Sequence, residues 1–162
     1  EMWPSGDVYE GEYAKDKFDG KGALKTRGGW YRGSFRNGAK SGQGLMNFNS
    51  GAVYEGEWEE NRFHGDGVYT WTTNQHYDGE WANGLREGVG AVTFPNGQRY
   101  DGEWKRGEMH GEGMWRWSNG TCRKGTWENG KRVQWTSDET FGMTGLSQAR
   151  KKAQKEKEKS RR

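Results

Sequence analysis

Polar and aromatic residues alternate in a short segment that returns five times along the chain. In each copy a Tyr is followed two residues later by Gly and, after two more, by a ring, as in Tyr54, Gly56 and Trp58. This alternation places the Tyr, the Gly and the ring on one face of a β-strand. The residues between them in the later copies are expected to point the other way, into water: Glu55, Glu57, Asp78, Glu80, Asp101 and Glu103.

The spacing of the copies is nearly constant. The leading tyrosines, Tyr9, Tyr31, Tyr54, Tyr77 and Tyr100, are 22, 23, 23 and 23 residues apart, and a G-x-G follows the ring in every copy. A sixth, partial copy keeps Gly125 and Trp127 but has Arg123 in place of the Tyr. A fixed period of this length is typical of repeat architectures.

Each copy predicts a β-hairpin. Turn signals such as Asn83-Gly84 follow the first alternating segment, and the G-x-G is expected to open a second strand that closes at turns such as Asn96-Gly97. A single hairpin cannot bury its aromatic face, so the hairpins must stack. The predicted fold is all-β, an elongated single-layer solenoid or ribbon of stacked antiparallel hairpins.

Composition supports a core built from rings and glycine. The 162 residues include 28 Gly, 10 Trp, 7 Tyr and 6 Phe, with no Ile and only four Leu. A Gly on the ring face leaves a flat place where a neighbouring side chain can lie. Nine recurring glycines are therefore predicted to be structural: Gly56, Gly65, Gly67, Gly79, Gly88, Gly90, Gly102, Gly111 and Gly113.

The chain divides into three predicted parts. Residues 1–135 form the ribbon of five full repeats and a partial sixth, residues 136–145 a linker, and residues 146–162 a basic tail that is helical or disordered. The tail carries eight Lys or Arg and two Glu, whereas the other residues sum to −3. Its candidate contacts with an anionic partner are Arg150, Lys151, Lys152 and Lys155.

No catalytic or metal-binding constellation emerges. His64 and His110 share one repeat position, just before the G-x-G, which favours a structural role. The carboxylates recur with the period, whereas a catalytic pair needs two different environments. The repeated G-x-G is followed by no helix pattern, unlike a phosphate loop. We expect no enzyme activity, no cofactor and no metal. The single Cys122 fits a reducing compartment and a cytoplasmic location.

These motifs resemble a known family. Y-x-G-x-W followed by G-x-G at a 23-residue period is similar to the MORN repeat (membrane occupation and recognition nexus), over residues 6–131. The resemblance implies a hairpin ribbon with an aromatic-lined groove and a scaffold role in cilia, the cytoskeleton or membrane junctions. The first copy has Thr26 where later ones have Phe or Trp, and the last lacks its Tyr, so both resemble capping units.

The aromatic stripes then predict the function. One side of a single-layer sheet is uncovered unless a partner covers it, and exposed apolar patches mark interaction sites. We expect a non-catalytic scaffold in a multi-protein complex, in the cytoplasm and within a cilium, axoneme or cytoskeletal structure. Its groove binds a partner helix or extended peptide through Tyr54, Trp58, Tyr69, Trp71, Tyr77, Trp81, Phe94, Tyr100, Trp104, Trp115 and Trp117.

Two other functions stay open. One is a membrane-surface module, in which the basic tail contacts anionic lipid. The other is the regulatory repeat domain of a larger enzyme, since the chain begins with Glu1 and is expected to be a piece of a longer protein. Unpaired strand edges would also permit a homodimer. Nucleic acid is not an expected partner, because the acidic strands repel phosphate.

Overall fold

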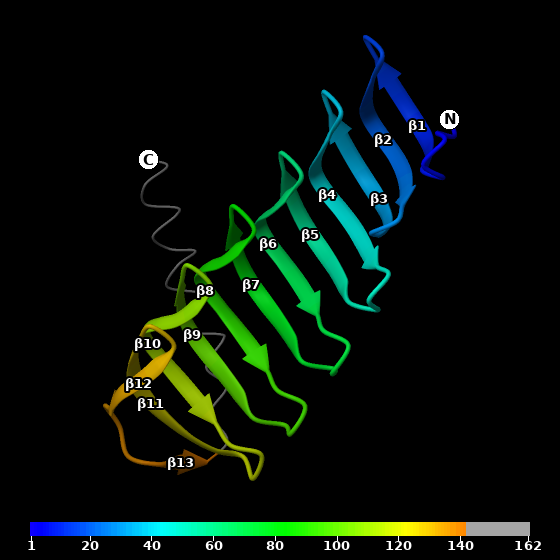
Figure 1. The fold of residues 1–162 in the computed structure, drawn as a ribbon. Coiled ribbons are helices and arrows are strands. Elements are labelled where there is room, and N and C mark those ends of the chain that lie inside the picture. The colour runs from blue at the N-terminus through cyan, green and yellow to red at the C-terminus, as the bar shows by residue number, and fades with distance from the viewer. Residues whose placement is uncertain (142–162) are drawn as a thin grey trace, which may run out of the picture. The chain divides into compact units, whose positions relative to one another are not determined.

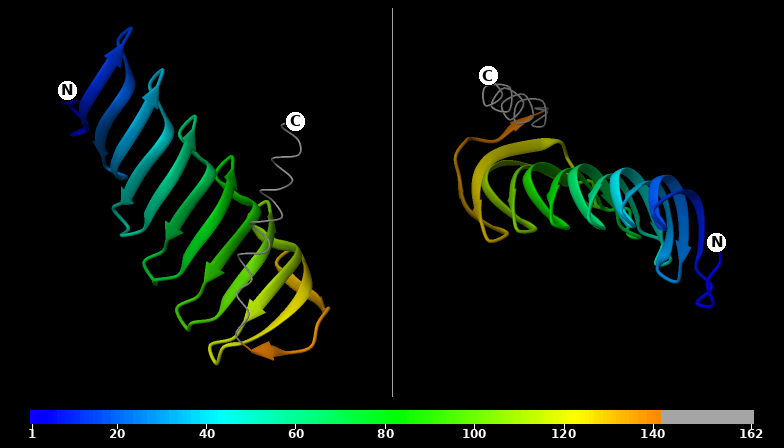
Figure 2. Two further views of the ribbon diagram at one scale, coloured as in Figure 1. Left: turned by 180° about the vertical axis from the view of Figure 1, so that it is seen from behind. Right: turned by 90° about the horizontal axis from the view of Figure 1, so that it is seen from above.

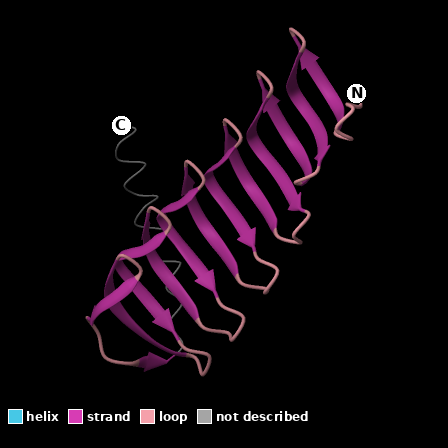
Figure 3. Cartoon of the chain, viewed as in Figure 1, coloured by secondary structure: helices cyan, strands magenta, loops and turns pink. Residues whose placement is uncertain are grey.

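The computed structural model describes residues 1–141, and this part of the chain is strands joined by turns, without a helix (Figures 1 and 3). The predicted all-β fold of antiparallel hairpins is confirmed. The predicted basic tail and the end of the predicted linker lie outside the described residues.

The chain forms two compact units. The first is Glu1–His76 with Trp81–Gly84, and the described part of the second is Tyr77–Glu80 with residues 85–141, so β7 (His76–Ala82) contributes to both. The strands of the first are β1 (Val8–Ala14), β2 (Lys17–Thr26), β3 (Gly29–Arg36), β4 (Ala39–Phe48), β5 (Val53–Glu59) and β6 (Arg62–Thr70). Those of the second are β8 (Leu85–Thr93), β9 (Arg99–Lys105), β10 (Glu108–Arg116), β11 (Thr121–Glu128), β12 (Lys131–Trp135) and β13 (Thr140–Phe141).

Within each unit, consecutive strands are hydrogen-bonded neighbours. The order is β1 to β6 in the first unit and β8 to β12 in the second, as the views of Figure 2 show. β13 departs from this order, because it pairs with β11. It lies inside the segment predicted as a linker.

Two-residue turns close the hairpins where the sequence predicts them. Asn83 and Gly84 have φ angles of 52° and 81°, and Arg106 and Gly107 have 49° and 85°. Two successive positive φ angles are typical of the type I′ turn, whose twist matches that of the strands. The predicted turn at Asn96-Gly97 also forms, with the Gly97 amide donating to the Phe94 carbonyl at 2.9 Å.

The prediction that G-x-G opens the second strand is wrong. β6 begins at Arg62, three residues before Gly65, so the motif lies inside the strand. Gly56 pairs with Gly67 but the next residue, Glu57, pairs with His64, so the register shifts at the motif. The first Gly has a φ of +53°. This positive φ accommodates a β-bulge that bends the strand without interrupting the hairpin.

The register puts the rings of both strands on one side of the sheet, here called the ring face. Tyr54 lies opposite Tyr69, and Trp58 lies opposite Phe63. Directly opposed residues share a face, so the second strand of each hairpin adds side chains to the same aromatic layer. The opposite side, here called the polar face, carries the alternate positions.

In each unit, buried rings follow one another along the ring face and make up most of the core. The leading tyrosines are at most 1% exposed and the following Trp residues at most 7%: Tyr9, Tyr31, Tyr54, Tyr77, Tyr100, Trp58, Trp81, Trp104 and Trp127. The Tyr54 hydroxyl donates to the Glu57 carbonyl at 2.8 Å, and the Trp58 indole donates to the Gly44 carbonyl at 3.2 Å. The hydroxyls of all five tyrosines and the indoles of Trp58, Trp81 and Trp104 donate in this way to backbone carbonyls, so these buried rings satisfy their polar atoms.

The alternation predicts that the acidic residues between the rings point into water. The structure differs from this expectation at Asp101 and at Glu57. Asp101 is only 6% exposed, and its carboxylate accepts two hydrogen bonds from Arg99 Nε and a third from Nη2, at 2.9–3.1 Å. Glu57 lies beside the bulge, where its Oε1 accepts a hydrogen bond from the Asp66 amide at 3.2 Å. Burial and the bulge therefore give these repeated acids structural roles.

Candidate partner-binding surface

The eleven residues predicted to line the binding surface divide into two groups. Six are buried core residues: Tyr54, Trp58, Tyr77, Trp81, Tyr100 and Trp104. Five are half-buried and keep part of their surface on the ring face: Tyr69, Trp71, Phe94, Trp115 and Trp117. Only the second group can offer substantial ring surface to a partner.

The half-buried rings of the first unit form one cluster. The centroids of Tyr69 and Trp71 are 4.6 Å apart, and Tyr69 lies 5.9 Å from Phe63 and 6.0 Å from Phe48. Sequence reasoning missed Phe48 and Phe63, which are also half-buried. Phe48 could have been found from the repeat, because it lies 23 residues before Trp71 at the same position.

The second unit carries two further ring pairs. The centroids of Phe94 and Trp115 are 5.5 Å apart, and those of Trp117 and Trp135 are 5.4 Å apart. Trp135 was not among the predicted residues. It follows the last repeat and joins the ring face because it lies opposite Gly125.

Cations stack on the rings, at a repeat position that the sequence analysis overlooked. The second residue after the first turn of each hairpin is Phe18, Lys40, Phe63, Arg86, Met109 or Arg132. Phe63 stacks on Tyr54 at 3.9 Å, whereas the Lys40 ammonium lies 5.0 Å from the Trp58 centroid and the Arg86 guanidinium 4.3 Å from that of Trp104. Burial lowers the pKa of Lys40 and of Arg86.

The nine predicted structural glycines occupy three kinds of position. Gly56, Gly79 and Gly102 lie so near the glycine opposite that a Cβ would meet its Cα. Gly67, Gly90 and Gly113 lie under the ring of the preceding Tyr. Gly65, Gly88 and Gly111 have positive φ angles and face a Glu carboxylate. In each case a side chain would displace backbone, ring or carboxylate.

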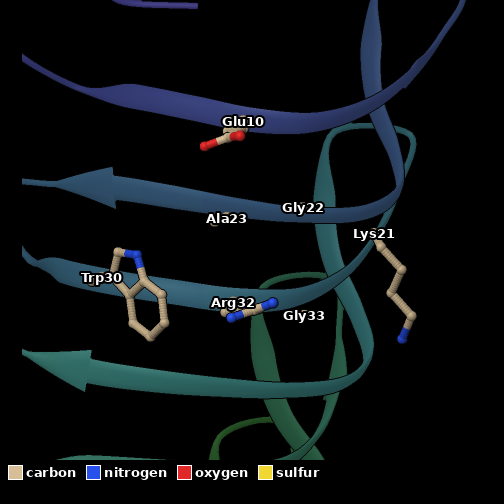
Figure 4. Close-up of a pocket in the computed structure, with 7 residues that line it drawn as sticks. All are labelled: Glu10, Lys21, Gly22, Ala23, Trp30, Arg32 and Gly33. Atoms are coloured by element: carbon tan, nitrogen blue, oxygen red, sulfur yellow. The ribbon is translucent and has the colours of Figure 1, made fainter.

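A pocket of about 660 Å³ lies on the polar face of β1–β3 rather than on the ring face. Figure 4 shows Ala23 between Glu10 on one side and Arg32 on the other, with Trp30 on the same strand as Arg32. Its other lining residues are Lys21, Gly22 and Gly33. The pocket therefore combines both signs of charge with a single half-buried ring.

Residues 1–141 contain no group of three or more His, Cys, Asp or Glu side chains that could hold a metal ion. His64 lies on the surface, with its Nδ1 3.3 Å from the Glu59 carboxylate. Cys122 is fully buried and its thiol donates to the Thr140 carbonyl of β13 at 3.3 Å. In the part of the chain described here, no helix is long and apolar enough to cross a membrane.

Stacked antiparallel hairpins with one repeated ring-and-glycine pattern define a β-hairpin repeat protein. The chain belongs to the MORN repeat family, whose model matches residues 9–29, 31–53, 54–75, 77–99, 100–122 and 124–133. The family is generally a non-enzymatic repeat module, which fits a scaffold. The sixth match confirms that the partial copy is a repeat.

Other comparisons add little. Comparison with curated protein sequences finds no match. Among solved structures, the chain is similar to the SAS-4 (dCPAP) TCP domain of Drosophila melanogaster, solved in complex with a proline-rich motif of Ana2 (dSTIL). The identity is 15%, the TM-score is 0.34, and the match covers 85% of this chain and 90% of that one.

Proposed function

We propose that the protein is a non-catalytic scaffold whose ring face binds a helical or extended segment of a partner protein within a larger assembly. The observation that carries this proposal is the set of half-buried rings on the ring face, above the fully buried tyrosines. The buried Tyr and Trp residues pack without using the outer surfaces of these half-buried rings. These surfaces are therefore available to a partner.

The physical case rests on how rings bind. Aromatic side chains bury a large area and lose little rotamer entropy, so they are frequent anchors of interfaces. Tyr69 and Trp71 in the first unit, and Phe94 and Trp115 in the second, are such neighbouring pairs. A partner segment with apolar side chains at regular intervals could contact the neighbouring rings within either unit.

The test compares rings on the two faces. The full chain, and variants with Trp71→Ser and Trp117→Ser, are used as baits with crosslinking and mass spectrometry. Trp30→Ser is the matched control, because Trp30 is also half-buried but lies on the polar face. Circular dichroism must show that every variant is folded.

We expect specific partner segments to crosslink near the ring face, and to be lost in the two ring-face variants but kept in the control. Equal loss in all three variants, or crosslinks confined to the polar face, would contradict the proposal. Vesicle binding that disappears on deletion of residues 146–162, with no ring-dependent partner, would favour the membrane-surface alternative.

The proposal includes a location. A cytoplasmic assembly, ciliary or cytoskeletal, is supported by the family resemblance and by the single cysteine of the sequence, which fits a reducing compartment. Imaging of the tagged protein in its own cells tests this part, and a signal confined to a secretory compartment would contradict it.

A further inference from the structure

In the second unit, the strand carboxylates lie on one face of the sheet only, whereas basic residues lie on both. The polar face carries Arg99, Lys105, Arg116, Lys124 and Lys131 beside the carboxylates. Arg123 lies opposite Trp115, and Arg132 lies opposite Trp127, so both arginines are on the ring face. Arg86 is two residues before Gly88, which pairs with Trp104, and its guanidinium stacks on that ring. The ring face of β8–β12 therefore carries three arginines.

The carboxylates of these strands take the other face. Asp101 lies opposite Ala91 and Met114, and Glu103 lies opposite Val89 and His110. The remaining strand carboxylates, Glu87, Glu108, Glu112 and Glu128, also occupy polar-face register positions. Along β8–β12, the ring face thus combines positive charge and aromatic surface, although residues 1–145 as a whole carry more acidic than basic side chains.

From the placement of the carboxylates on the polar face alone we infer that the partner segment bound by the second unit is acidic, with apolar residues between its Asp and Glu side chains. The inference rests on the proposed function and specifies its partner. Guanidinium groups are weakly hydrated, and they bind carboxylates through paired hydrogen bonds. The Arg132 side chain is exposed, and its guanidinium lies 4.4 Å from the Trp135 centroid. A carboxylate bound there would lie beside an aromatic surface that an apolar neighbour could cover.

A nucleic acid could also use arginines and rings, but the arrangement favours a peptide. Bases stack on open ring faces. Here the rings pack against each other: the Trp117 and Trp135 planes meet at 51°, and those of Phe94 and Trp115 at 36°.

The experiment selects peptides from a random phage-displayed library on the full chain. The selected peptides are then synthesised, and their affinities are measured by fluorescence anisotropy at low and high salt. The key variant is Arg132→Glu. The matched control is Lys124→Glu, which makes the same change of charge at an exposed site on the polar face. The basic residues of 146–162 are common to both variants, so the difference between them reports on the ring face.

We expect selected peptides to be enriched in Asp, Glu and apolar residues. Their affinity should fall about tenfold with Arg132→Glu, stay unchanged with Lys124→Glu, and weaken as salt rises. Peptides that depend on Trp117 but show no acidic excess, or that bind Arg132→Glu equally well, would overturn this inference and leave the proposed function standing. If no selected peptide loses affinity in the Trp117→Ser variant, the result would contradict the proposed function itself. A single-stranded oligonucleotide that binds more tightly than every peptide, with the same dependence on Arg132, would assign the face to nucleic acid.

Discussion

Each buried tyrosine depends on glycines in its own strand and in the strand beside it. Tyr100 lies above the pair formed by Gly102 and Gly113, and its hydroxyl donates to the Glu103 carbonyl at 3.0 Å. The ring can lie flat and reach this acceptor only because neither glycine has a side chain. The Tyr-x-Gly spacing and the second Gly of G-x-G are thus parts of one packing unit.

Gly102→Ala should therefore destabilise the protein strongly. Its Cβ would lie 2.5 Å from the Tyr100 hydroxyl and 2.6 Å from the Gly113 Cα, so both the ring and the neighbouring strand must shift. We expect a loss of about 2–3 kcal/mol in the free energy of unfolding, measured by denaturant titration. Gly28→Ala is the control, because its nearest neighbour is 3.6 Å away. Equal stability of the two variants would show that the ring does not need the glycine.

Within each hairpin, a glutamate links the first strand to the bulge of the second. Glu12 accepts a hydrogen bond from the Lys21 amide at 2.8 Å, as Glu57 does from Asp66. The bulge leaves amide groups outside the regular ladder, and the carboxylate satisfies one of them. The first Gly of G-x-G, with its positive φ, brings the backbone close enough for this contact.

Removing the hydrogen bond between the Asp66 amide and the Glu57 carboxylate should lower the free energy of unfolding. Glu57→Ala is expected to cost about 1 kcal/mol, because the Asp66 amide loses its carboxylate acceptor. Glu57→Gln keeps an acceptor oxygen and should recover most of that loss. Glu55→Ala, at an exposed position on the same strand, should change stability by less than about 0.5 kcal/mol. If Glu55→Ala costs as much as Glu57→Ala, then the loss reflects strand charge rather than the bulge.

Repeat spacing was sufficient to predict the hairpins and their turns, because alternation and Asn-Gly pairs are local signals. It could not locate the bulge, since the register shift between Gly56 and Glu57 belongs to the pairing of β5 with β6 and not to either strand alone. It also treated all rings of a stripe alike. Trp58 lies within β5 opposite Phe63 and is buried, whereas Trp71 follows the last residue of β6 and is half-buried. The repeat pattern alone does not show this difference.

At the scale of the whole chain, the sequence shows a small net charge but not where the charges lie. Arg123 stands where the earlier copies have Tyr, so in the motif it is only a mismatch of the last copy. In the structure it lies on the ring face, opposite Trp115. Conversely, Asp101 fits the exposed pattern of its repeat but is buried with Arg99. The Arg99 and Asp101 side chains pair within β9, at a two-residue spacing that the sequence shows. The burial of Asp101 depends on the neighbouring strands, where it lies opposite Ala91 and Met114, and one strand alone does not show it.

The repeated tyrosines should make the whole fold sensitive to alkali. Burial raises the pKa of Tyr31 from 10.0 to about 12, and it raises the pKa of Tyr54 and Tyr100 further. Their folded-state pKa values lie above the unfolded value, so the stability they contribute is fully present below about pH 10. It declines as the pH rises through 10 to 12 and above, because only the unfolded chain then readily loses these protons.

This dependence can be measured by following tyrosinate absorbance and the thermal midpoint over the same pH range. In the folded protein, the buried tyrosines should titrate late and together with unfolding, whereas in denaturant all seven should titrate near pH 10. Tyr54→Phe should remove one of the tyrosines that titrate above pH 10. The thermal midpoint should then fall less steeply as the pH rises. A folded protein that ionises all its tyrosines near pH 10 with an unchanged midpoint would show that the hydroxyls reach solvent, and the buried row would then not be the core of the sheet.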